Sequence, residues 1–209
     1  MLNALYQVTV IIGVPSYGLA IIFLTILIKT VLYPLTKKQM QSMAVMQRLA
    51  PQVKEIQEKW KQRDPKKMQA MIMDLYKQNN ANPLAGCLPL VIQMPILIVL
   101  FRTLLSFNYI DEQHASFFWI PSLSVPDPFW ILPVLAALTT FLQSKMTMSM
   151  TDPTQRMMVI MMPLLIGWIS INMPSGMVLY WAMFNVMGIG QQYYINRTVL
   201  PAKEGATGK

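Results

Sequence analysis

The sequence contains almost none of the side chains that build most catalytic centres. It has one cysteine, Cys87, and one histidine, His114, so it forms no internal disulfide and offers neither a cysteine–histidine pair nor a histidine-rich metal site. It also lacks a glycine-rich phosphate loop and the G-x-S-x-G turn of many hydrolases. We therefore expect a protein that is not an enzyme and that needs no metal or cofactor, and we expect His114 to be a solvated loop residue.

Charged residues are scarce as well. Only 12% of the 209 residues are charged, 54% are hydrophobic, and the mean hydropathy is +0.41, which is typical of membrane proteins. Apolar segments near the ~20 residues that cross a bilayer as a helix occupy residues 16–36, 84–106, 128–145, 155–172 and 176–195. Because lipid offers no partners for backbone groups, these segments predict an all-α membrane protein with five transmembrane helices.

The basic residues lie on one side of the predicted membrane. Ten of the 17 Lys and Arg fall between Lys37 and Lys77, and apart from Lys29 and Arg102 the others flank the loop 146–154 or lie in the tail 196–209. The segment from Ser106 to Asp127 has none. The positive-inside rule then places the N-terminus and the loop 107–127 outside, and the tail in the cytosol. Residues 1–15 are short for a crossing and predict an external segment with an interfacial helix.

Residues 37–82 form the one long polar segment, and their pattern is helical. Apolar side chains recur at heptad spacing, at Met46, Leu49, Val53, Ile56 and Trp60. Asp64 followed by Pro65 predicts the cap and the first residue of a second helix, so we expect a cytosolic antiparallel helical hairpin. Its cations suit either anionic lipid headgroups or the docking of a ribosome, a targeting factor or a client.

Lys29 stands in an apolar stretch, where a cation costs about 2.5 to 3.5 kcal/mol near the centre of a spanning helix. Snorkelling of its long side chain to the headgroups is one explanation, and a functional site is the other.

Further polar side chains lie inside the predicted spans, at Thr25, Gln93, Thr139, Thr140, Gln143 and Asn185. Thr25 shares a helix face with Lys29, as Trp181 does with Asn185, because each pair is four residues apart. Each amide alone suits an interhelical hydrogen bond. The whole set beside an unpaired Lys29 predicts a hydrated cavity.

Three stretches of sequence are distinctive, YPLT at 33–36, NPLAGCLPLVIQMP at 82–95 and PSGMVLYW at 174–181. Together they resemble the YidC family of membrane protein insertases, over a range from about Ser16 to Ile195. The resemblance implies a five-helix core in the bacterial cytoplasmic membrane, with a hydrophilic groove in the inner leaflet that opens to cytosol and lipid. The large external domain of Gram-negative members is missing, so we expect a short form of the family.

The resemblance also implies where clients bind. The groove cation of the family falls on Lys29, its neighbouring threonine on Thr25, and its client-contacting surface on Gln93, Met94 and Trp181. To this groove we add Gln143 and Asn185 from the polar pattern. The family usually has Arg at the position of Lys29, and lysine lacks the planar guanidinium that binds carboxylates with two hydrogen bonds.

These features predict a membrane protein insertase and chaperone that accepts hydrophilic client segments in the groove and releases their transmembrane segments into lipid. The expected partners are nascent or newly made membrane proteins and anionic lipids, and a ribosome, a targeting factor and a secretion channel are further candidates. We expect no direct nucleic-acid specificity. A small channel or transporter using the same polar cavity is the alternative, and a membrane scaffold is a third interpretation.

Overall fold

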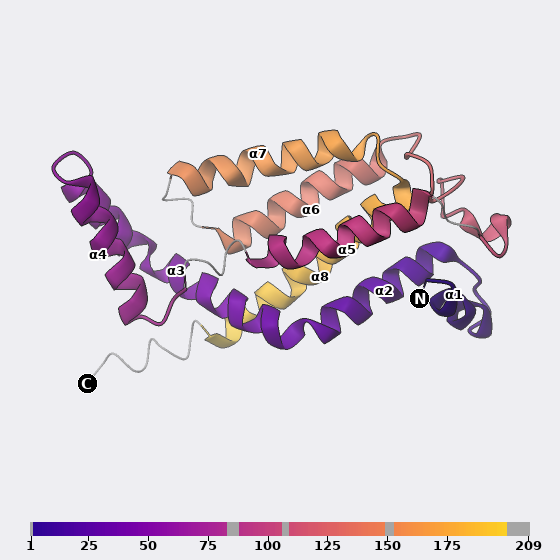
Figure 1. Ribbon diagram of the computed structural model, residues 1–209, viewed down its shortest axis with the longest axis horizontal. Helices are drawn as coiled ribbons and strands as arrows, with labels where there is room; N and C mark the ends of the chain where they lie inside the picture. Colours follow the sequence, from indigo (N-terminus) through magenta and orange to yellow (C-terminus); the bar gives the residue numbers. More distant parts are fainter. Residues whose placement is uncertain (1, 83–87, 106–108, 149–152, 200–209) are drawn as a thin grey trace.

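The computed structural model describes residues 2–82, 88–105, 109–148 and 153–199. Within these ranges the elements are α1 (Leu2–Ile11), α2 (Tyr17–Val31), α3 (Tyr33–Trp60), α4 (Pro65–Gln78), α5 (Leu88–Leu105), the 3-10 helix η2 (Glu112–Ala115), α6 (Ile131–Thr147), α7 (Pro153–Ser170) and α8 (Ser175–Val199). Every regular element of the described part is therefore helical, and only an isolated bridge between Phe117 and Ile120 resembles strand pairing there. The predicted all-α class is confirmed (Figure 1).

The five apolar segments of the sequence correspond to α2 and to α5 through α8. Residues 84–87, including Cys87, residues 149–152 of the loop 146–154 and the tail beyond 199 lie outside the described residues. By length and composition, none of the described helices alone qualifies as a membrane crossing, whereas α2 and α3 qualify together with a 69° bend between them. The number of crossings therefore stays a prediction.

The bend between α2 and α3 lies at Leu32, whose N–H still donates to the Ile28 carbonyl at 2.9 Å. Pro34 explains it, because proline has no N–H and its ring clashes with the carbonyl four residues earlier, here that of Thr30. Residues 33–36, which the hydropathy pattern assigns to the first span, consequently belong to the helix beyond the bend.

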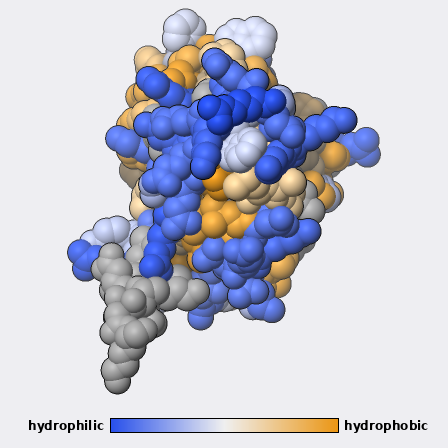
Figure 2. All heavy atoms as spheres, turned by 90° about the vertical axis from the view of Figure 1, so that its left-hand side faces the viewer, coloured by the Kyte–Doolittle hydropathy of each residue, from blue (hydrophilic) through white to orange (hydrophobic). Residues whose placement is uncertain are grey.

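Helices α3 and α4 lie side by side and project from one end of the molecule (Figure 1). Asp64 caps α4 as predicted, since its Oδ1 accepts from the backbone N–H of Lys67 at 3.0 Å and Pro65 is the first helical residue. Leu49 and Val53 of the heptad positions are buried. Seen from this end, hydrophilic residues cover most of the surface and surround a patch of hydrophobic residues (Figure 2).

One hydrogen bond ties the base of this projection to the helical bundle. The Gln47 side chain on α3 donates its Nε2–H to the backbone carbonyl of Met146 at 2.8 Å. Met146 lies in the last turn of α6, where carbonyls have no partner within the helix. The side chain thus satisfies one of these carbonyls and connects α3 to α6.

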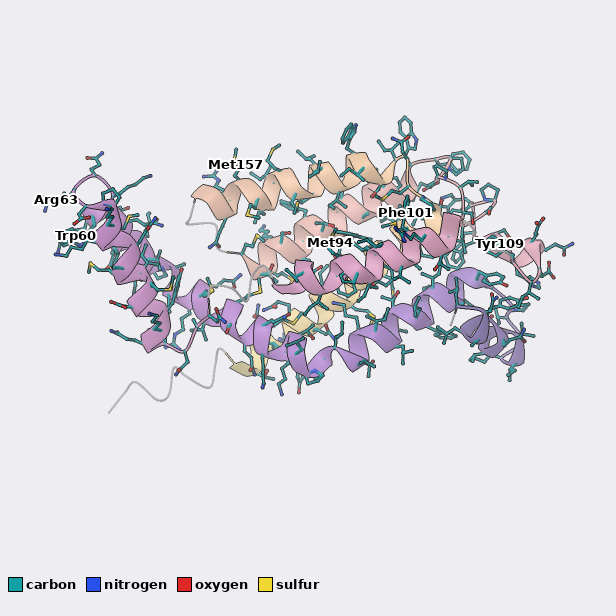
Figure 3. The ribbon with its side chains drawn as sticks, viewed as in Figure 1. Trp60, Arg63, Met94, Phe101, Tyr109 and Met157 are labelled. Atoms are coloured by element: carbon teal, nitrogen blue, oxygen red, sulfur yellow. The ribbon has the colours of Figure 1, made fainter. Side chains whose placement is uncertain are left out.

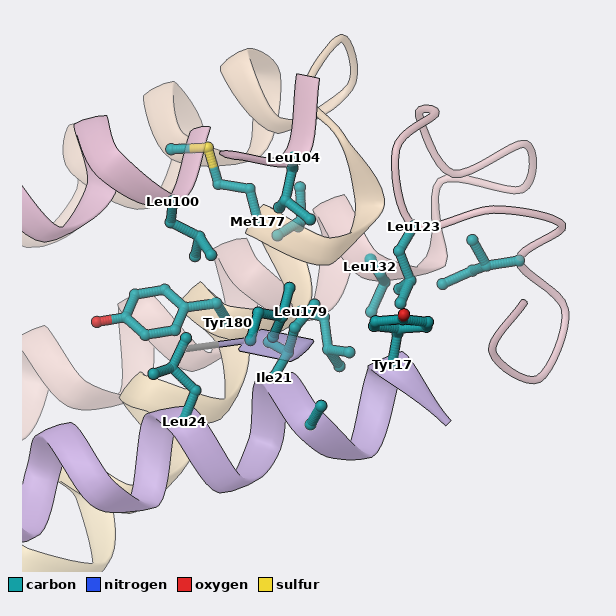
Figure 4. Close-up of a cluster of buried hydrophobic side chains, with 14 of the residues drawn as sticks. Tyr17, Ile21, Leu24, Leu100, Leu104, Leu123, Leu132, Met177, Leu179 and Tyr180 are labelled. Carbon is teal, nitrogen blue, oxygen red and sulfur yellow. The ribbon is translucent and has the colours of Figure 1, made fainter. Parts of the chain in front are cut away.

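The apolar core lies between α2, α5, α6 and α8, toward the end of the bundle opposite α3 and α4 (Figures 1 and 4). Tyr17 and Ile21 of α2, Leu104 of α5 and Tyr180 of α8 are fully buried in it, and Leu123 of the connecting loop closes it. The loop backbone also accepts from the start of α8, because Ser175 donates its N–H to the Val125 carbonyl at 2.8 Å. This end of the bundle is sealed by apolar packing.

An aromatic cap covers the sealed end. The rings of Tyr6 on α1 and Tyr17 on α2 stack with centroids 4.1 Å apart, and Tyr109 meets Tyr17 edge-on at 4.8 Å. The prediction for His114 is wrong: it is half-buried, its Nδ1 lies 2.7 Å from the Tyr6 hydroxyl, and Asp111 lies 3.5 Å away. A cap of this kind joins segments about a hundred residues apart, so loop polarity alone does not reveal it.

Candidate polar site around Lys29

Lys29 is buried in the bundle rather than extended toward solvent. It lies in the last turn of α2, its exposed fraction is 2%, and its Nζ lies 3.6 Å from the centroid of the Phe184 ring on α8. Among the described residues it forms no ion pair or hydrogen bond. A cation–π contact of a desolvated ammonium contributes about 2 kcal/mol, well below the cost of burying an unpaired charge. The ammonium is thus a charge that has no acceptor in the part of the chain that the structure describes.

Thr25 lies one turn before Lys29 and is also buried. Its hydroxyl donates to the Ile21 carbonyl of the same helix at 2.7 Å. The predicted shared face of Thr25 and Lys29 is therefore present, but this hydrogen bond of Thr25 stays within α2. Bonds of this type satisfy the hydroxyl without a partner helix.

A hydrogen-bonded network joins α6 to α8 beside Lys29. In the amide orientation that pairs all its neighbours, the oxygen of Asn185 accepts from Trp181 Nε1 at 3.2 Å and from Thr140 Oγ1 at 2.8 Å. Its nitrogen then donates to Gln143 Oε1 at 2.6 Å. Trp181 and Asn185 thus act on one face of α8, as their spacing predicts.

The network reaches Lys29 at a glycine of α8. A Cβ atom at Gly188 would lie 2.5 Å from Gln143 Nε2 and 3.2 Å from Lys29 Nζ. Both nitrogens therefore lie close to the space that a side chain at residue 188 would occupy. The site that results combines a buried ammonium, an aromatic face and amides fixed by hydrogen bonds.

Gln93 and Met94 lie on α5, apart from this network. Gln93 is buried and donates its Nε2–H to the Tyr180 hydroxyl at 3.0 Å. The Tyr180 ring is 5.9 Å from that of Phe184, so aromatic rings connect Gln93 to the Lys29 site. Met94, labelled on α5 in Figure 3, is 47% exposed.

Of the predicted groove, the structure brings together Lys29, Gln143, Trp181 and Asn185, with Thr25 beside Lys29. Gln93 is connected to this group through the rings of Tyr180 and Phe184. Met94 lies on the outer surface. Sequence reasoning missed Phe184 and Gly188. Both follow Tyr180 at intervals of four residues, which places the three on one helix face. This four-residue spacing is the sequence feature that could have indicated that Phe184 and Gly188 line the site.

Apolar helices that enclose an ionisable side chain with neutral polar partners are characteristic of helical membrane proteins with a functional interior. The comparisons agree with this class. The sequence profile of the family described as 60Kd inner membrane protein matches residues 7–203. The chain therefore belongs to this family.

Curated relatives carry the name membrane protein insertase YidC. The protein of Geobacter sp. strain M21 is 43% identical over 185 residues, which are 88% of this chain and 34% of the relative. The protein of Wolinella succinogenes is 44% identical over 196 residues, 93% of this chain and 36% of the relative. The resemblance indicated by the sequence motifs is confirmed, and the chain spans about a third of the length of these relatives.

A solved structure shares the fold. The crystal structure titled "Active YidC insertase crystal structure with the first transmembrane domain resolved" superposes with a TM-score of 0.72 at 27% identity. The match covers 92% of this chain and 44% of the crystallised chain. The helical arrangement described above is therefore that of a known insertase.

Proposed function

We propose that the chain is a membrane protein insertase and chaperone, and not an enzyme. The observation that carries the proposal is Lys29, a buried ammonium without an acceptor among the described residues, beside a fixed polar face on α6 and α8. Such a charge suits a transient partner that brings its own oxygen atoms. The relatives named insertases support a client polypeptide as this partner.

The proposed topology has five crossings, at α2, α5, α6, α7 and α8, in the bacterial cytoplasmic membrane. Contacts of α8 run from Ile21 at Gly176 to Lys29 at Gly188, so α2 and α8 point the same way, as an odd number of crossings requires. Basic residues concentrate on α3 and α4, which supports a cytosolic position for this pair. The N-terminus and the aromatic cap then face the outside.

In the proposed mechanism a hydrophilic client segment enters the inner half of the bundle from the cytosol. The client-binding groove comprises Lys29, Thr25, Gln93, Met94, Gln143, Trp181 and Asn185. Entry shortens the apolar distance that the polar segment must cross, and acidic residues in it are attracted to Lys29. The membrane potential adds about 2.3 kcal/mol per 100 mV for each anion that moves outward.

Release follows as the hydrophobic segment of the client moves along α5 and α8 into lipid. Each Leu, Ile, Val or Phe that enters the bilayer centre contributes about 0.3 to 0.6 kcal/mol, so a ~20-residue segment gains several kcal/mol. This gain offsets the short polar passage without a nucleotide. The exposed Met94 on α5 supports this lipid-facing path.

Helices α3 and α4 are the proposed docking region for partners on the cytosolic side. Their cations support contact with anionic lipids, a ribosome or a targeting factor, and a secretion channel is a further candidate. The Gln47 bond to α6 supports a role in which a bound partner is held close to the groove.

The charge of Lys29 is the feature to test. We expect Lys29→Arg to keep insertion of a single-span client with an acidic tail in reconstituted liposomes, and Lys29→Glu to abolish it, because the buried charge then repels the tail. Arg156→Glu is the matched control, since it also replaces a positive by a negative charge, at an exposed position on α7 outside the groove and the docking region.

Equal insertion by Lys29→Arg and Lys29→Glu would contradict the electrostatic role of the site. Flux of ions or small solutes through client-free liposomes would favour the alternative, a small channel or transporter. The same vesicles serve for both measurements.

A further inference from the structure

Two glycines near the end of α8 have opposite surroundings. Gly188 is buried, and a Cβ there would collide with Gln143 Nε2 at 2.5 Å and approach Lys29 Nζ at 3.2 Å. Gly190 is exposed, and a Cβ there would have no neighbour within 4 Å. Either glycine alone lowers the helix propensity of α8, so only the space at Gly188 distinguishes them.

The amide of Gln143 is held toward Gly188 by a hydrogen bond at its oxygen. Its Oε1 accepts from the Asn185 nitrogen at 2.6 Å, and Asn185 is itself held by Trp181 and Thr140. The remaining Nε2 therefore points to the glycine. A methyl group at residue 188 would have to displace this amide and would also press on the Lys29 ammonium, 3.2 Å away.

We propose that Gly188 is a positioning residue of the Lys29 site. Its missing side chain lets the Gln143 amide and the Lys29 ammonium meet on the α8 backbone, with the ammonium held over the Phe184 ring. This inference deepens the proposed insertase function and rests on it for its effect on activity. The positions of the Gln143 amide and the Lys29 ammonium at Gly188 do not depend on that function.

The position of Lys29 can be followed directly. We would label the protein with lysine that carries ¹³C at Cε, record spectra in lipid nanodiscs, and assign the Lys29 signal by its loss in Lys29→Arg. Because Nζ lies 3.6 Å from the Phe184 centroid, the ε-protons should show an upfield ring-current shift. This measurement needs no client.

We expect Gly188→Ala to reduce that upfield shift and to slow client insertion about tenfold, because the displaced ammonium would lose about one hydrogen bond to a client carboxylate. Gly190→Ala should leave both the Lys29 signal and insertion unchanged. An unaltered Lys29 signal in Gly188→Ala, or equal changes in both variants, would overturn the proposal.

A second variant separates positioning from general disruption. Gln143→Ala removes both atoms nearest the new methyl group, so Gly188→Ala with Gln143→Ala should insert clients no more slowly than Gln143→Ala alone and should fold even if Gly188→Ala does not. Additive losses, or a double variant that fails to fold, would overturn the proposal. Failure of the insertase function itself is detected separately, by the absence of client insertion in liposomes that contain the unchanged protein.

Discussion

The contact between α2 and α8 is built differently at its two ends, although the same two helices form both. At one end, Gly176 lies against Ile21 of α2 and Leu104 of α5, within an apolar core. At the other end, Gly188 lies against Lys29 and Gln143. Close helix approach at a small residue is thus used once to seal the bundle and once to gather polar groups.

The difference teaches how one bundle combines stability with a charged interior. At the apolar end, complementary packing around Leu104 and Tyr180 supplies stability without any charge. At the polar end, the amides of Asn185 and Gln143 bond to each other, whereas the ammonium has no acceptor among the described residues. Changes at the two ends should therefore have different consequences, stability at one and activity at the other.

The largest expected effect on stability is at the apolar end. Leu104→Ala leaves a cavity at a fully buried position and should lower the free energy of unfolding by about 2 to 5 kcal/mol. Reversible unfolding in detergent measures the loss, with Ile98→Ala at an exposed position of the same helix as control. A loss of insertion by the fully folded variant would show that the two ends are not separate.

An intermediate effect is expected from the polar network. Asn185→Leu removes the partner of Trp181, Thr140 and Gln143 and should cost about 1 to 2 kcal/mol in stability. It should also slow insertion, because the Gln143 amide is no longer fixed. Val186→Leu, the neighbouring exposed position, is the control. If Asn185→Leu is less stable but inserts clients at the normal rate, the hydrogen bonds of Asn185 have only a structural role.

The smallest expected effect lies between the two ends. Gln93→Leu deletes one interhelical hydrogen bond to Tyr180 and should cost about 0.6 kcal/mol, the average for such bonds in membranes. A double-mutant cycle with Tyr180→Phe isolates this bond, because the two changes remove the same interaction. An interaction energy near zero would mean that the bond contributes nothing to stability.

The sequence predicts those features whose causes are local. Asp64 and Pro65 start α4 as expected, because capping depends on neighbouring residues. Lys29 with Thr25, and Trp181 with Asn185, share faces because helical spacing alone decides this. The break at Leu32 also has a local cause, Pro34, but a hydropathy pattern does not register it.

The remaining features depend on how distant helices pack. Nothing near Phe184 in the sequence indicates that Lys29 lies over its ring, and the bond between Gln143 and Asn185 requires the register of α6 against α8. Met94 follows Gln93 directly yet is exposed where Gln93 is buried, because successive helical residues differ by about 100° in direction. His114 pairs with Tyr6 for the same reason of long-range packing.

The bond from Gln47 to the Met146 carbonyl has a mechanical consequence. Gln47 lies on the long helix that leaves the bundle, and Met146 lies three residues after Gln143 on α6. A displacement of α3 and α4 would therefore be passed through this hydrogen bond to the turn of α6 that contains Gln143. The projecting pair is therefore attached to the helix turn of α6 that also carries Gln143.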